Sequence, residues 1–255
     1  MHDVLVFAAL AWEVRAVTQA LSGVEPGGRP GTWRGYLGDG ASCLVVRTGI
    51  GLDRACAAAE GSPPARLFLS AGCAGALAGD LRAGDLVLAD AVLRLDRDLR
   101  PAERLPASTV GLMAWAARRG FDTRAGLVVS SPVVLDGSAR PTVAAASGGC
   151  VVEMESAAVA AVARRRGIPF LGVRVVLDEV DQVLPNAPGM LDEATGEMRV
   201  LRTVGALAVR PGWWPGLPRL ARQRQVCERR LRTFMGALLG GGLDALGQSP
   251  SVATG

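Results

Sequence analysis

The sequence contains no lysine, and its one histidine, His2, stands second in the chain. All 28 basic residues are therefore arginines. These absences exclude a Ser-His-Asp or Cys-His catalytic pair, a histidine-rich metal site, a Schiff-base lysine and a Walker A lysine. Any catalysis must come from carboxylates, arginines, hydroxyls or backbone amides.

Long apolar runs and a cysteine framework are also missing. No stretch approaches the roughly 18 uninterrupted apolar residues that a membrane-spanning helix needs. The apolar run at residues 4–10 has no basic leader and is too short for a signal peptide. The five cysteines are odd in number and widely spaced, and they form no CxxC motif, which predicts reduced thiols. We therefore expect a cytoplasmic protein, with peripheral contact to the inner face of the membrane left open.

The residues that are present favour a globular α/β domain. Hydrophobic residues make up 49% of the chain and charged residues 20%, enough apolar side chains for a substantial core. Short β-branched runs predict strands at residues 4–9, 43–48, 66–71, 85–92, 126–130 and 172–177. Alanine-rich stretches predict helices at residues 13–21, 53–60, 110–119 and 156–166. Strands that are apolar on both faces and alternate with helices predict a three-layer α/β/α sandwich with a central mixed, twisted sheet.

The composition changes after Asp181, where prolines interrupt the pattern. We expect a catalytic domain at residues 1–184, a proline- and arginine-rich extension at 185–243 and a loose tail at 244–255. A last helix in the extension carries an apolar stripe opposed by arginines. The stripe consists of Leu220, Cys227, Leu231, Phe234 and Leu238.

Positive charge gathers in this extension. Residues 199–232 hold nine arginines and one acid, Glu228, whereas the whole chain has a net charge of only +4. The rest of the chain is therefore mildly acidic, which argues against nucleic-acid binding by the main domain. The arginine cluster either binds a negatively charged partner or forms only a solvated face of a helix.

Ligands of open α/β sheets bind beyond the carboxyl ends of the strands, so the residues after each predicted strand are candidates for a site. Glu13 follows the first strand, although a glutamate in a first helical turn also serves as a dipole partner. Residues 48–51, Thr-Gly-Ile-Gly, form a glycine turn that brings backbone close to a ligand, but as a dinucleotide signal it is weak. The small residues at 70–76 fit either a ligand or tight packing.

Two acidic segments complete this set. Glu153 and Glu155 end one apolar run, and Asp178 ends another that contains Arg174. Arginine is seldom buried without a partner, so we expect one of these carboxylates to contact Arg174. A purely structural ion pair is the alternative.

In this order the segments resemble the nucleoside phosphorylase/nucleosidase superfamily, which includes purine nucleoside phosphorylases, 5'-methylthioadenosine/S-adenosylhomocysteine nucleosidases and futalosine hydrolases. The similarity runs from residue 4 to about residue 181. It rests on the strand followed by Glu13, the Gly-Ile-Gly turn, Gly-Cys-Ala-Gly at 72–75 before Ala-Gly-Asp-Leu-Val at 83–87, Glu-Met-Glu-Ser at 153–156, and the Arg174 to Asp178 strand end.

The resemblance to the nucleosidase branch implies three catalytic roles. Glu13 would orient and deprotonate the attacking water, Asp178 would hydrogen-bond the purine and protonate N7, and Glu155 would hold the ribose hydroxyls. Cleavage of an N-glycosidic bond passes through an oxocarbenium-like sugar, which needs a proton donor for the base and a positioned nucleophile. Two separated carboxylates supply both without histidine or lysine.

The same resemblance implies the substrate-binding residues. Met154 would pack beneath the sugar and Arg174 would help to fix Glu155 and the water. Gly49 belongs to the turn that approaches the ligand, Cys73 stands where many relatives have serine, and Val134 would flank the base. No metal or cofactor is implied, although inorganic phosphate is an open co-substrate.

Three departures from the family pattern bear on the reaction. Leu177 precedes Asp178 where the superfamily commonly has serine, so a hydroxyl that could orient the acid is missing. Val134 replaces an aromatic residue that often stacks on the base, which should weaken stacking. The phosphate-binding arginine loop of the phosphorylases is not evident, so we expect hydrolysis, with phosphorolysis through Arg47 or Arg15 left open.

Residues 210–222, Arg-Pro-Gly-Trp-Trp-Pro-Gly-Leu-Pro-Arg-Leu-Ala-Arg, look like the C-terminal extension of the hopanoid-associated phosphorylases. This similarity implies release of adenine from adenosylhopane, a lipid-linked nucleoside, during hopanoid biosynthesis. The tryptophan pair beside an arginine-rich amphipathic helix suits an interfacial membrane contact, and packing of the helix on the sheet is the alternative. Relatives in the nucleosidase branch imply a homodimer. The other functions considered are a purine nucleoside phosphorylase, a methylthioadenosine/S-adenosylhomocysteine nucleosidase and a non-catalytic nucleoside-binding module.

Overall fold

The computed structural model describes residues 2–135, 137–182 and 216–243. Its ten strands are β1 (His2–Ala8), β2 (Ser22–Pro26), β3 (Thr32–Tyr36), β4 (Ser42–Arg47), β5 (Ala65–Ala76), β6 (Leu86–Leu95), β7 (Pro101–Pro106), β8 (Thr123–Ser130), β9 (Val151–Glu153) and β10 (Phe170–Asp178). Its α-helices are α1 (Ala11–Thr18), α2 (Leu52–Glu60), α3 (Val110–Arg118), α4 (Ala139–Ser147), α5 (Ser156–Arg165) and α7 (Leu217–Ala237), and a π-helix, η2 (Leu238–Gly242), continues α7.

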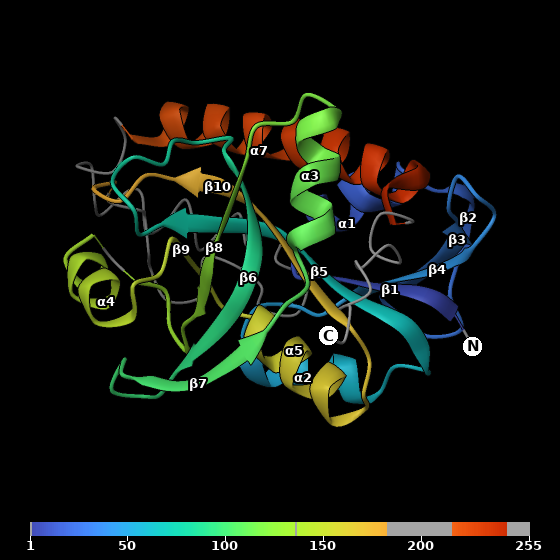
Figure 1. The fold of residues 1–255 in the computed structure, drawn as a ribbon, viewed down its shortest axis with the longest axis horizontal. Coiled ribbons are helices and arrows are strands. Elements are labelled where there is room, and N and C mark those ends of the chain that lie inside the picture. Colours follow the sequence, from blue (N-terminus) through green and yellow to red (C-terminus); the bar gives the residue numbers. More distant parts are fainter. Residues whose placement is uncertain (1, 136, 183–215, 244–255) are drawn as a thin grey trace, which may run out of the picture.

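The strands form one mixed sheet with helices on both faces, so the expected three-layer α/β/α architecture is confirmed. Helices α1, α3 and α7 cover one face, and α2 and α5 cover the other (Figure 1). Side chains of β1 alternate between the two layers: Val4, Val6 and Ala8 join the core under α1 and α7, while Leu5 and Phe7 join the core under α2 and α5. Because both faces of the strand are covered by helices, successive residues of β1 are all apolar.

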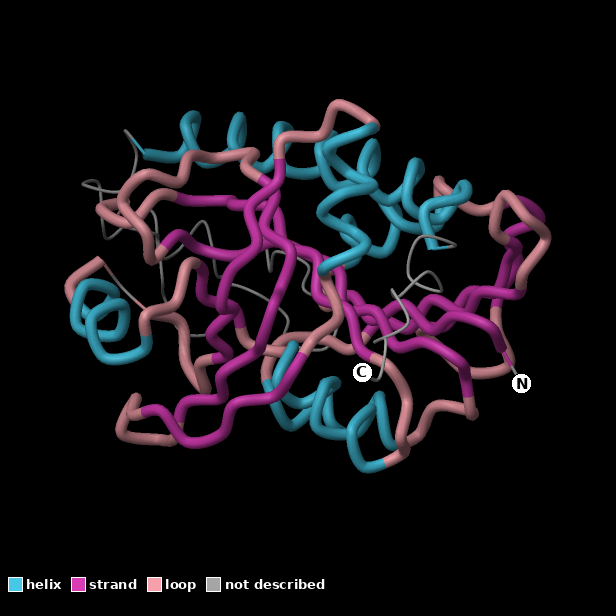
Figure 2. Tube along the Cα trace, viewed as in Figure 1, coloured by secondary structure: helices cyan, strands magenta, loops and turns pink. Residues whose placement is uncertain are grey.

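The sheet curls back on itself. Its order is β10-β6-β8-β9-β5-β1-β4-β3-β2, and β10 also pairs with β5, so that five strands close a ring from which the others extend (Figure 2). β1, β4, β5 and β10 are parallel where they pair. Their carboxyl ends therefore meet at one edge of the sheet, where the ring opens.

Four strands and one helix lie outside the elements that the sequence predicted. They are β2, β3, β7, β9 and α4. The small residues at 70–76 were expected to follow a strand, but β5 runs through them to Ala76 because β9 and β10 both pair with this segment. The glycines there lie within the ladder and leave room for neighbouring side chains.

Helix α7 lies on the sheet. Cys227, Leu231, Phe234 and Leu238 of its predicted apolar stripe are at most 1% exposed and belong to the core that includes β10, and Leu220 is half-buried. The ring of Phe234 meets Trp115 of α3 edge to face. The buried part of the stripe therefore has no free face for a membrane, and the tryptophan pair lies outside the described residues. Within the described residues no helix has the length and hydropathy to cross a bilayer.

Candidate active site

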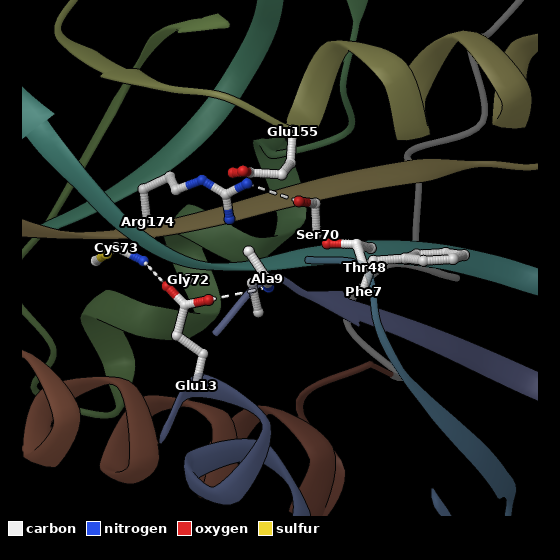
Figure 3. A pocket seen from close by; sticks show the side chains of 10 residues that line it. Phe7, Ala9, Glu13, Thr48, Ser70, Gly72, Cys73, Glu155 and Arg174 are labelled. Carbon is white, nitrogen blue, oxygen red and sulfur yellow. Dashed lines mark hydrogen bonds between the residues drawn. The ribbon is translucent and has the colours of Figure 1, made fainter. Parts of the chain in front are cut away.

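A cavity of about 190 Å³ opens where β5 and β10 end and α1 and α5 begin. Glu13, Met154, Glu155 and Asp178 line it. A second cavity of only about 10 Å³ adjoins it and shares Glu13, Cys73 and Glu155, with Arg174 on its wall (Figure 3). Glu13 and Asp178, 165 positions apart in the sequence, thus line the same larger cavity.

Glu13 is held at the start of α1 by the backbone. Its Oε2 accepts the N–H groups of Ala9 at 3.0 Å and Leu10 at 2.9 Å, as a capping glutamate does. Its Oε1 accepts the N–H of Cys73 at 2.8 Å from β5. A side chain at Gly72 would collide with this carboxylate, because its Cβ would lie 2.7 Å from Oε1. Glu13 is therefore both a helix-terminal residue and a fixed carboxylate of the cavity.

Burial raises the pKa of Glu13, and the N–H donors of Cys73 and Leu10 oppose that rise. The result is a buried carboxyl whose proton affinity is increased while its position is fixed. A general base for water needs both properties, since a more basic carboxylate takes a proton more readily.

Glu155 is the residue that precedes the first turn of α5. Its Oε1 accepts the N–H of Gly51 at 2.9 Å. Gly49 and Gly51 both have positive φ, 75° and 102°, which explains the Gly-Ile-Gly sequence of this turn. Burial, and then the neighbouring charge of Glu153, raise the pKa of Glu155 to about 8. Its carboxyl can thus either donate to or accept from a hydroxyl near neutral pH.

Arg174 contacts one of the nearby carboxylates, as expected, and that carboxylate is Glu153. Nη2 of Arg174 donates to Glu153 at 2.7 Å, and to the hydroxyls of Ser70 and Ser156 at 2.6 Å each. Glu153 also accepts from the N–H groups of Glu155 and Ser156 and from the hydroxyl of Ser130. The carboxylate of Glu153 is therefore saturated, and the pair fixes the β9–α5 junction that carries Glu155.

Asp178 has a partner that the sequence did not reveal. Nη2 of Arg140, from α4, forms a buried ion pair with its Oδ2. Burial raises the pKa of Asp178, and the charge of Arg140 opposes that rise. Within the described residues Oδ2 has no partner besides Arg140. Arg140 also lines the cavity, but it belongs to none of the sequence motifs that pointed to the site.

Three of the predicted substrate-binding residues, Met154, Cys73 and Val134, line the larger cavity. Val134 is 45% exposed at the mouth of this cavity. Gly49 lines neither cavity; its neighbours Ile50 and Gly51 stand nearer, Ile50 in the wall of the larger cavity.

The two arginines considered for phosphate lie elsewhere. Arg47 stacks over Trp33 with its guanidinium carbon 5.9 Å from the ring centre, and Arg15 is exposed on α1. Neither belongs to the wall of the two cavities. In the described part of the chain, no group of three or more histidine, cysteine, aspartate or glutamate side chains is placed to hold a metal ion.

The fold and the cavity define a class of proteins: an α/β enzyme that sets buried carboxylates around a small-molecule cleft at strand ends. The model of the phosphorylase superfamily matches residues 3–204, and the chain belongs to that superfamily. It is an enzyme of the nucleosidase and nucleoside phosphorylase kind, which acts on N-glycosidic bonds.

Solved structures share this fold at low identity. A 5'-methylthioadenosine/S-adenosylhomocysteine nucleosidase from Neisseria meningitidis is 18% identical, with a TM-score of 0.69 over 94% of this chain and 99% of that one. Futalosine hydrolase of Helicobacter pylori is 17% identical, with a TM-score of 0.67 over 93% and 98%. A mutant nucleosidase of H. pylori, solved with 5'-methylthioadenosine in its active site, is 16% identical, with a TM-score of 0.66 over 93% and 100%.

Proposed function

We propose that the chain hydrolyses the N-glycosidic bond of a 5'-substituted adenosine and releases adenine. The observation that carries this proposal is the placement of three carboxyls around one cavity, the buried Glu13 and Asp178 and the partly buried Glu155. Glu155 would hold the ribose hydroxyls, Asp178 would bind the base and give a proton to N7, and Glu13 would take a proton from water. Departure of a protonated base and attack of an activated water are the two requirements of the reaction.

The small cavity supports water as the nucleophile. Its volume of about 10 Å³ is about the least in which a single water molecule fits. Glu13 and Glu155 offer acceptors there, and Nε of Arg174 is buried with no hydrogen-bond partner among the described residues. Phosphate has five non-hydrogen atoms and does not fit this volume, and Arg47 and Arg15 stand outside it. Hydrolysis is therefore favoured over phosphorolysis.

For the 5' substituent we propose an apolar group, with adenosylhopane as the substrate to test first. Val133 and Val134 are 51% and 45% exposed, and Val134 also lines the cavity, so the cleft continues onto apolar surface. The similarity of residues 210–222 to the hopanoid-associated extension supports the same choice. Membrane contact through the buried stripe of α7 forms no part of this proposal.

A second candidate is a small polar thionucleoside such as S-adenosylhomocysteine. A groove of about 360 Å³ begins at Ile50, which also lines the larger cavity, and it is lined by Arg94, Arg97 and Asp96 among others. Charged walls of both signs suit an amino acid group rather than a hydrocarbon.

Chromatography of free adenine after incubation with adenosylhopane, methylthioadenosine, S-adenosylhomocysteine or inosine tests the proposal. We expect adenine from the adenosines without added phosphate, and a much reduced rate for Glu13→Gln. The exposed variant Glu25→Gln, which breaks the surface pair with Arg34, should behave as wild type. Absence of base release from all four compounds, with and without phosphate, would contradict the proposal, and calorimetric binding without turnover would favour a nucleoside-binding module.

The choice of 5' substituent has its own variant. Val134→Ser should raise KM for adenosylhopane more than KM for S-adenosylhomocysteine, because only the hydrocarbon loses apolar contact. An equal change for both substrates would count against the apolar mouth.

A further inference from the structure

The ion pair between Arg140 and Asp178 lies inside the cavity wall and has no counterpart among the family motifs that the sequence carries. We propose that Arg140 is a positioning residue for Asp178: its guanidinium fixes the direction of the carboxylate in the cavity and stabilises the ionised form that remains after the base has taken a proton. This inference rests on the proposed cleavage of an adenosine.

Arg140 is itself rigidly held. Its Nη1 donates to the carbonyl of Glu179 at 3.0 Å, and its Nε donates to the carbonyl of Leu135 at 3.4 Å. The residue is only 2% exposed. Because two nitrogens of the guanidinium are held by carbonyls, the third, Nη2, faces Asp178 in a fixed direction. A serine hydroxyl, which rotates freely, would orient the carboxylate less strictly.

The backbone around the pair makes room for it. Gly75 of β5 stands opposite Asp178 in the ladder, and a Cβ there would lie 2.8 Å from Nη2 of Arg140 and 3.1 Å from Oδ2 of Asp178. The pairing of β5 with β10 shifts between Val176 and Asp178. A glycine and a ladder irregularity at the same point accommodate the two side chains.

Arg140 also supplies the contact to Asp178 that a serine hydroxyl at position 177 would make. Leu177 stands where the superfamily commonly has serine before the acid, and this leucine lines the cavity without offering a hydrogen bond. The orienting contact for Asp178 comes instead from α4, 38 positions earlier in the chain. The ion pair therefore takes over the orientation that the hydroxyl would have given.

The electrostatic environment of Asp178 leaves Arg140 as the dominant charge. Among the described residues, the titratable groups that act on it or respond to it come from three elements: Arg140 of α4, Cys73 of β5 and Cys227 of α7. Burial raises the pKa of both thiols, so they are neutral near pH 7. Burial of Asp178 favours its protonated form, and Arg140 favours the ionised form.

This balance suits a proton donor. When the bond between C1' and N9 breaks, its electron pair goes to the base, the proton of Asp178 passes to N7, water oxygen bonds to C1', and Glu13 receives a proton from that water. Asp178 ends the step ionised, next to Arg140. Arg140 therefore makes Asp178 a stronger acid than burial alone would allow.

The test compares Arg140→Gln and Arg140→Lys with the exposed control Arg124→Gln, which breaks a surface pair with Asp80. In Arg140→Gln we expect kcat to fall at least about tenfold, KM to change less, and the alkaline limb of the pH profile to move up by about one unit or more. Arg140→Lys keeps the positive charge but loses the planar guanidinium with its several donors. It should lower kcat and leave the alkaline limb of the pH profile unchanged. In an Asp178→Asn background, Arg140→Gln should cause no further loss.

A titration of the substrate-free protein separates this inference from the proposed function. Carbon-13 NMR of the Asp178 carboxyl, assigned with Asp178→Asn, should show ionisation at a higher pH in Arg140→Gln than in wild type. If Arg140→Gln does not fold, the same titration of Arg140→Lys should match wild type, and a shift there would overturn the inference. Equal ionisation in wild type and folded Arg140→Gln would also overturn it, whereas a wild type with no turnover would overturn the proposed function alone.

Discussion

Two buried arginine–carboxylate pairs border the two adjoining cavities, and they differ in how fully the carboxylate is bonded. Glu153 accepts from Arg174, from two backbone N–H groups and from a serine hydroxyl. Asp178 pairs with Arg140, and its Oδ2 has no other partner within the described residues. A saturated pair stabilises the architecture, whereas an unsaturated carboxylate in a cavity wall keeps acceptor capacity for a ligand.

The same contrast separates Glu153 from Glu155, two residues away. Glu155 accepts one hydrogen bond at 2.9 Å from Gly51 and a longer one, 3.3 Å, from Met154. It stands in the wall of both cavities. Within one short segment, the first glutamate therefore anchors the backbone and the second is presented to the substrate.

The largest expected effect comes from removing the acid of the unsaturated pair. Asp178→Asn should lower turnover by about 10²–10⁴-fold, because an amide cannot give a proton to N7. Adenine release measures the loss, circular dichroism verifies folding, and the exposed variant Asp80→Asn is the control. Full activity in Asp178→Asn would remove this residue from the mechanism.

Breaking the saturated pair should act mainly on stability. Glu153→Ala leaves Arg174 buried without its counterion, and we expect the free energy of unfolding to fall by about 3–5 kcal/mol. Urea denaturation measures this loss. Asp178→Asn should cost less in the same experiment, because asparagine keeps the size of the side chain and Arg140 retains its hydrogen bonds to the carbonyls of Leu135 and Glu179. Equal losses in the two variants would erase the distinction between the pairs.

The pH dependence of stability should follow the buried acids. Glu13, Glu155 and Asp178 all have a raised pKa in the folded protein. A raised pKa means that the folded state binds the proton more tightly, so the contribution is complete below the unfolded value and is lost as the pH rises through the folded value. For Glu155 this window runs from 4.5 to about 8.

The melting temperature should therefore decrease between pH 5 and pH 8, and Glu155→Gln should flatten the decrease. Thermal unfolding followed at several pH values provides the measurement. A melting temperature that rises over this range in wild type would mean that these carboxyls are ionised at low pH in the folded state.

The smallest effect is expected at Cys73. Glu13 is held by the backbone N–H of this residue, which Cys73→Ser keeps, and a partly buried free thiol acts as a small apolar group. Turnover should change by less than about threefold, as steady-state kinetics would show. A loss as large as that of Asp178→Asn would give the thiol a role of its own.

Much of the sheet was predictable because its strands alternate between two apolar layers. The edge strand β2, Ser22–Pro26, was not, since it is exposed along its whole length and contains glycine and proline. Its pairing with β3 defines it, and a pairing partner leaves no mark in local hydropathy.

The site was predictable where it follows strand ends. The sequence pointed to Glu13, Glu155 and Asp178, which the structure brings to one cavity. It did not separate Glu153 from Glu155 as the partner of Arg174, because both acids lie in one short segment and only the turn of the backbone decides. Arg140 was missed because its partner is 38 residues away and no sequence motif includes it.

The proposed hydrolysis can be tested most directly by the origin of the oxygen on C1' of the sugar product. A single turnover in ¹⁸O-labelled water with inorganic phosphate present, followed by mass spectrometry, distinguishes the two acceptors. We predict a free sugar that carries one ¹⁸O atom, from water placed between Glu13 and Arg174. A sugar 1-phosphate as the product would contradict the account.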